Sequence, residues 1–78
     1  MLYKRSSFIR WLINVKDCNV VPIGDEDKPG ALVIWNGPIK KYMGTDRKDR
    51  IDYEEIYLVC RNLMIDGLPG DKELERID

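Results

Sequence analysis

Residues 51–67 read Ile-Asp-Tyr-Glu-Glu-Ile-Tyr-Leu-Val-Cys-Arg-Asn-Leu-Met-Ile-Asp-Gly and carry both a start and a stop signal for a helix. Asp52 can accept hydrogen bonds from the free N–H groups of a first turn, and Glu55 has the spacing of a capping box. Gly67 suits the left-handed conformation that ends helices, and Pro69 prevents the helix from resuming. Between these signals, apolar residues recur at three- and four-residue intervals, namely Ile56, Val59, Cys60, Leu63 and Met64. The segment therefore predicts an amphipathic helix.

Strand signals precede this helix. Residues 31–35 form a short, continuous apolar run, which is typical of a central strand covered on both faces. Asn36-Gly37 is the strongest short hairpin signal, so residues 38–43 are predicted to form the partner strand. Residues 20–23 are rich in β-branched side chains, which favour a strand, and Pro22 restricts that strand to an edge or an irregular position.

A first helix is predicted at the start of the chain. Ser6 or Ser7 can cap it, and its apolar residues extend it to about Lys16. The predicted order is therefore helix, strand, strand, strand, helix. We expect an α+β fold in which a three-stranded antiparallel sheet carries both helices on one face.

The length of 78 residues allows one domain, which we place at residues 1–70. Residues 71–78 then form a charged C-terminal tail in which only Leu74 and Ile77 are apolar. Such a tail is either a short docked turn or a solvated segment, and we expect it to be mobile.

The hydropathy does not predict a membrane-spanning segment. The overall charge predicts no net attraction to nucleic acid or to an acidic membrane surface. The formal net charge is −1, and no apolar run reaches the roughly 18–20 residues that span a bilayer. Arg10 interrupts the apolar stretch near the N-terminus, and no small-residue cleavage site follows it. We expect a cytoplasmic protein.

The residues that usually carry catalysis are scarce. The absence of histidine removes the commonest general base and metal ligand. Cys18 and Cys60 are interpreted as buried free thiols, with a single bridge in a secreted form as the alternative. The acidic run at residues 25–27 lacks the alternation of a calcium loop and reads as a solvated turn. We expect no enzyme activity, no catalytic residue, no cofactor and no metal site.

Local basic clusters are the main candidate for a binding surface. Residues 40–50 carry five basic and two acidic side chains, an excess of three positive charges. Combined with basic residues near the first helix and with interleaved aromatic residues, they fit one footprint of nucleic-acid binding. Ordinary surface charge is the competing interpretation. The candidate nucleic-acid-binding residues are Arg5, Arg10, Lys40, Lys41, Arg47, Lys48 and Arg50.

The closing segment Val59-Cys60-Arg61-Asn62-Leu63-Met64-Ile65, the length and the element order resemble those of the HicA (YcfA-like) toxins. That family has a fold similar to a double-stranded-RNA-binding domain, and the resemblance covers roughly residues 7–65. The family's Gly-Ser-His segment corresponds here to Gly24-Asp25-Glu26, which has no histidine. The resemblance thus implies a related fold without the ribonuclease activity.

Two functional hypotheses follow. The first is a small non-enzymatic binding module that contacts an RNA or DNA backbone through the basic residues. The second is a protein-interaction or accessory subunit, phage- or mobile-element-encoded or homo-oligomeric, that uses its sheet face or a strand edge. The aromatic strands and the marginal core of so short a chain motivate this alternative.

Overall fold

The protein is an α+β fold, as the sequence predicts. The computed structural model describes residues 1–24, 29–35, 39–44 and 49–77, and only the backbone of residues 24, 29, 35 and 39–44. Its elements are β1 (Leu2–Tyr3), α1 (Arg5–Asn14), β2 (Asn19–Gly24), β3 (Pro29–Trp35), β4 (Ile39–Gly44), β5 (Ile51–Asp52), α2 (Tyr53–Asn62) and the short 3-10 turn η1 (Asp71–Glu73). The Asn36-Gly37 turn and the acidic run at residues 25–27 lie outside the described residues.

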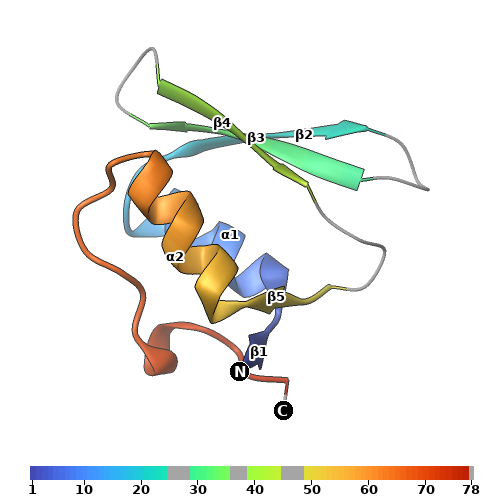
Figure 1. Cartoon of the computed structure of the whole chain (residues 1–78), viewed down its shortest axis with the longest axis vertical. Helices are drawn as coiled ribbons and strands as arrows, with labels where there is room; N and C mark the ends of the chain where they lie inside the picture. Colours follow the sequence, from blue (N-terminus) through green and yellow to red (C-terminus); the bar gives the residue numbers. More distant parts are fainter. Residues whose placement is uncertain (25–28, 36–38, 45–48, 78) are drawn as a thin grey trace.

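The largest sheet is antiparallel and has the order β2-β3-β4. Val33 in the central strand lies opposite Val20 of β2 and Lys41 of β4. Strand β2 is therefore an edge strand, which agrees with the restriction that Pro22 places on it. Figure 1 shows both helices on one side of this sheet.

The predicted architecture was wrong in one respect, because a second antiparallel sheet joins β1 to β5. Leu2 lies opposite Asp52, and Tyr3 lies opposite Ile51. On its other side Tyr3 forms an antiparallel bridge with Arg76. Strands of two residues are too short to show an alternating pattern, so no sequence signal marks them.

The C-terminal segment is docked, which corrects the expected mobile tail beyond residue 70. Leu74 is buried, the Lys4 N–H donates to the Glu75 carbonyl at 2.8 Å, and the Ile77 N–H donates to the Leu2 carbonyl at 2.9 Å. The backbone of residues 71–77 thus finds hydrogen-bond partners in β1 and at the start of α1. This is the docked turn that the sequence left open as the alternative.

Both helices differ from prediction at their ends. Helix α1 begins at Arg5, and neither Ser6 nor Ser7 occupies its N-cap position. Helix α2 has the predicted cap, since the Glu54 N–H donates to Asp52 Oδ1 at 3.0 Å. It ends at Asn62, earlier than predicted, because Met64 already adopts a positive φ of 55°.

The core lies between the helices and the three-stranded sheet. Phe8, Leu12, Ile56 and Leu63 are fully buried, and Val33 contributes from the sheet. Of the two tryptophans, Trp11 belongs to this core. The side chain of Trp35 lies outside the description.

Candidate functional site

Two arginines of the predicted basic surface, Arg5 and Arg10, lie in different surroundings. Arg5 is buried, and its guanidinium lies 3.9 Å from the carboxylate of Asp49. Arg10 is exposed and lies 3.5 Å from Glu75. Exposed ion pairs contribute at most about 1 kcal/mol, so Arg10 remains an accessible cation, whereas Arg5 does not.

The remaining predicted residues are not gathered into a site by the described structure. Arg50 is exposed and precedes β5. Lys40 and Lys41 lie in β4, opposite Ile34 and Val33 respectively, with their side chains outside the description. Arg47 and Lys48 lie outside the described residues altogether. The nucleic-acid surface therefore stays a prediction.

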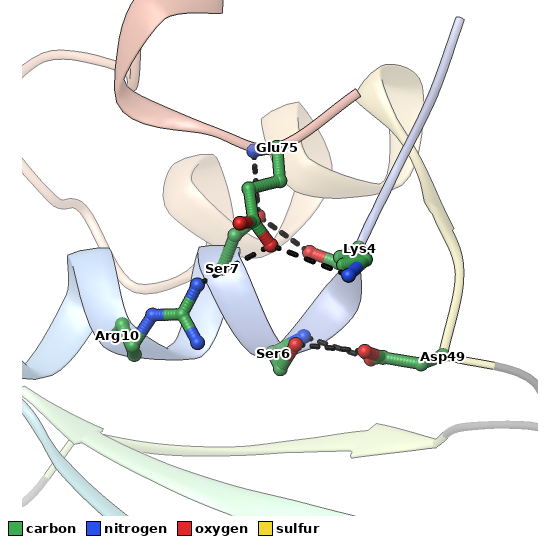
Figure 2. A network of polar contacts seen from close by, with 6 residues as sticks. All are labelled: Lys4, Ser6, Ser7, Arg10, Asp49 and Glu75. Carbon is green, nitrogen blue, oxygen red and sulfur yellow. Dashed lines mark hydrogen bonds and ion pairs between the residues drawn. The ribbon is translucent and has the colours of Figure 1, made fainter. Parts of the chain in front are cut away.

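Asp49 caps helix α1 from a distant part of the chain. Its carboxylate accepts the Ser6 backbone N–H at 2.9 Å and the Ser6 hydroxyl at 2.7 Å, as Figure 2 shows. Desolvation opposes ionisation of Asp49, but the hydrogen bonds from Ser6 and the charges of Arg5 and Lys4 outweigh it and lower the pKa of Asp49. The positive end of α1 is thus already occupied by an anion from the chain itself.

Ser7 and Glu75 form the second half of the same network (Figure 2). The buried Ser7 hydroxyl donates to the Lys4 carbonyl at 2.6 Å and accepts the Glu75 N–H at 3.1 Å. The Glu75 carboxylate lies 3.7 Å from the Lys4 ammonium and 3.5 Å from the Arg10 guanidinium. These contacts hold the C-terminal segment against α1, so we assign the network a structural role.

Glu73 connects the C-terminal segment to the core tryptophan. The Trp11 indole N–H donates to Glu73 Oε2 at 2.8 Å, and the Gly70 N–H donates to Glu73 Oε1 at 2.9 Å. The hydrogen bond from Gly70 and then that from Trp11 lower the pKa of Glu73. The Lys16 ammonium lies 5.7 Å from the centroid of the Trp11 ring system, within the range of a cation–π contact.

The two thiols are buried and free, as the sequence predicts. Burial raises the pKa of Cys60 to about 11 and also raises the pKa of Cys18. A protonated, buried thiol is a poor nucleophile and a poor metal ligand. Among the described residues, no group of three or more acidic or cysteine side chains could hold a metal ion.

Four aliphatic residues of β2 and β3 lie on the face of the three-stranded sheet that is not part of the core. Pairing places Val21 opposite Leu32, and the alternation along the strands puts Ile23 and Ile34 on the same face. Val21 is 45% exposed, and Leu32, Ile23 and Ile34 are half-buried. We call these four residues the open sheet face. The opposite face, which includes Val33, packs against the core.

A groove opens where β1, β5, the start of α2 and the C-terminal segment meet. Its volume is about 650 Å³, and we call it the tyrosine groove. Its lining includes Tyr3, Tyr53, Tyr57, Asp52, Glu54 and Asp71. Sequence reasoning missed this site, although Tyr53 and Tyr57 have the four-residue spacing that places two side chains on one face of a helix.

Comparisons of this chain with family models, with curated proteins and with solved structures found no match. The resemblance to the HicA toxins therefore stays a prediction drawn from the sequence. In the part of the chain that the structure describes, no helix is long and apolar enough to cross a membrane.

Proposed function

We propose that the protein is a non-enzymatic protein-interaction module that pairs with a second copy of itself through the open sheet face. The observation that carries the proposal is the composition of β3. Its residues Ala31 and Val33 are buried under the helices, and its residues Leu32 and Ile34 are equally apolar on the other face.

An antiparallel sheet with one face in water normally alternates between apolar and polar residues. Strand β3 does not alternate between apolar and polar residues. This supports a functional state of the protein in which both faces of the strand are covered. The helices supply one cover, and in the described part of the chain no helix or strand supplies the other (Figure 1). Covering this face would remove apolar surface from water, which is the main driving force for association.

A second copy fits this face because it brings an identical aliphatic surface. The four residues of the open sheet face are uncharged, and the register places Lys40 of β4 beside them, opposite Ile34. Two sheets packed face to face are a common arrangement, and twofold dimers are the commonest oligomers. Pairing along the β2 edge is less suitable, since Pro22 cannot donate a hydrogen bond there.

The test is the oligomeric state by sedimentation at protein concentrations up to about 100 µM, a range that detects weak complexes. The wild type should sediment as a dimer, and Val21→Asp should sediment as a monomer. Val21→Thr keeps the β-branched shape and should weaken the dimer without disturbing the strand. The control is Val15→Asp, which places the same charge on an exposed residue at the end of α1 and should leave the dimer intact.

A monomeric wild type, or a dimer that persists in Val21→Asp, would overturn the proposal. The same samples titrated with duplex RNA and DNA at two salt concentrations test the nucleic-acid alternative. Binding that weakens steeply with salt, and that Val21→Asp leaves unchanged, would support the basic residues as the site instead.

A further inference from the structure

The tyrosine groove lies apart from the open sheet face. Figure 1 shows β1, β5 and the C-terminal segment at the opposite end of the molecule from the three-stranded sheet. The groove is built from segments distant in sequence, since Tyr3, Tyr53 and Asp71 all line it. Binding at the groove is therefore independent of the proposed dimer.

Two of its tyrosines are held rigidly. The Tyr3 hydroxyl donates to Asp71 Oδ1 at 2.7 Å, and the Tyr53 hydroxyl donates to the Pro69 carbonyl at 2.8 Å. Their ring centroids are 6.0 Å apart, and the rings are inclined at 58°. The aromatic wall is thus formed before any ligand arrives, which reduces the entropy that binding must overcome.

The third tyrosine supplies the exposed aromatic surface. Tyr57 is 45% exposed and lies one helical turn beyond Tyr53, so it extends the same side of α2. A tyrosine ring attracts a cation placed over its face, and it also packs against an aliphatic chain. Tyr57 is therefore suited to contact a long side chain that ends in a positive charge.

The charges around the groove favour a cation. Three exposed carboxylates line it, those of Asp52, Glu54 and Asp71, against the guanidinium of Arg76. The carboxylates remain in excess when the α-amino group of Met1, which also lines the groove, is added to the positive side. An anion is disfavoured at the positive end of α2, because Asp52 and Glu54 already lie there.

We infer that the tyrosine groove binds a basic peptide segment of a partner protein, with a lysine or arginine side chain lying along Tyr57 and its charge near Glu54. The aliphatic stem of such a side chain covers aromatic surface while its charged end reaches the carboxylates. A volume of about 650 Å³ exceeds what one ammonium group fills, so flanking peptide residues have room as well.

The experiment measures binding of the full chain to fluorescent peptides that differ only in their central residues, which are Lys and Arg, neutral Gln, or Glu. The basic peptide should bind saturably and more tightly than the neutral one, and the acidic peptide should bind least. Tyr57→Ala should weaken binding of the basic peptide by about two- to fivefold, the equivalent of an exposed cation–π contact. Glu54→Gln should weaken it and reduce its dependence on salt.

Two matched controls lie on the same helix. Leu58→Ala removes an exposed apolar side chain next to Tyr57, and Glu55→Gln removes an exposed carboxylate next to Glu54. Neither residue lines the groove, so both variants should bind the basic peptide within about twofold of the wild type. Sedimentation should give the same oligomeric state for Tyr57→Ala as for the wild type.

Three results would overturn the inference. The first is equal binding of the acidic and basic peptides. The second is a loss of affinity in the controls as large as that in Tyr57→Ala. The third is displacement of the peptide by free arginine at the peptide's own affinity, which would indicate a site for a small cation rather than for a peptide.

Discussion

The strands at the two ends of this molecule differ in how completely the rest of the chain covers them. At one end, β1 is only two residues long, yet β5 pairs with one of its edges and the C-terminal segment pairs with the other. At the other end, β2, β3 and β4 make a larger sheet that the helices cover on one face only (Figure 1). In the described residues, both edges of β1 are thus paired, whereas one face of the three-stranded sheet has no helix or strand over it.

The difference supports the proposed pairing through the open sheet face. At the closed end, the exposed polar groups of β1 are satisfied by the chain's own backbone, through contacts such as that of Ile77 with Leu2. Every buried side-chain nitrogen or oxygen in the described residues has a hydrogen-bond partner. At the open end, by contrast, the four residues of the open sheet face leave aliphatic surface in contact with water, and removing such surface from water is favourable.

The largest effect on stability is expected from a substitution at Leu74, in the closed end. Leu74 is the buried apolar residue of the C-terminal segment, so Leu74→Ala should lower the free energy of unfolding by about 2–3 kcal/mol. Urea unfolding followed by circular dichroism measures the change. The control is Leu68→Ala, which truncates a leucine that is 43% exposed and should cost less than about 0.5 kcal/mol. Equal effects of the two substitutions would mean that the segment does not contribute to the core.

A smaller effect is expected where the C-terminal segment meets helix α1. Ser7→Ala removes the hydroxyl that accepts the Glu75 N–H, and it should lower the free energy of unfolding by about 1–2 kcal/mol because that donor loses its partner. Ser6→Ala is the matched variant, since it gains the same helix propensity but loses only an exposed bond to Asp49. Ser6→Ala should therefore cost less than Ser7→Ala, and the reverse order would contradict the assigned role of the network.

The parts of the fold that the sequence predicted are those with local signals. Asp52 caps α2 as expected, and four of the five predicted stripe residues are buried, whereas Met64 is 72% exposed. Pro22 marked an edge strand correctly. The pairing of β1 with β5, and that of Tyr3 with Arg76, join residues about 50 and 70 positions apart, and two-residue strands have no periodicity to reveal them.

The site was harder to predict, because charge composition does not show which charges pair. Arg5 reads as a surface cation in the sequence, yet the fold buries it beside Asp49, which lies 44 positions further along the chain. The tyrosine groove depends on Tyr3 and Asp71 meeting across the whole length of the domain. Only the spacing of Tyr53 and Tyr57 was a local clue to it.

The smallest effect at the closed end is expected in the pH dependence of its stability, since its carboxylates are partly exposed. Hydrogen bonds from Gly70 and Trp11 lower the pKa of Glu73 below its ordinary value of 4.5, so folding favours the ionised form. The stability that this carboxylate contributes is therefore fully present above pH 4.5, and it is lost as the pH falls through the lower pKa of the folded state.

Glu73→Gln should unfold at a lower temperature than the wild type at neutral pH, and the two melting temperatures should converge in acid. Glu55→Gln, which removes an exposed carboxylate from α2, should follow the wild type throughout. A constant difference between Glu73→Gln and the wild type at every pH would show that the ionised carboxylate does not hold the C-terminal segment to Trp11.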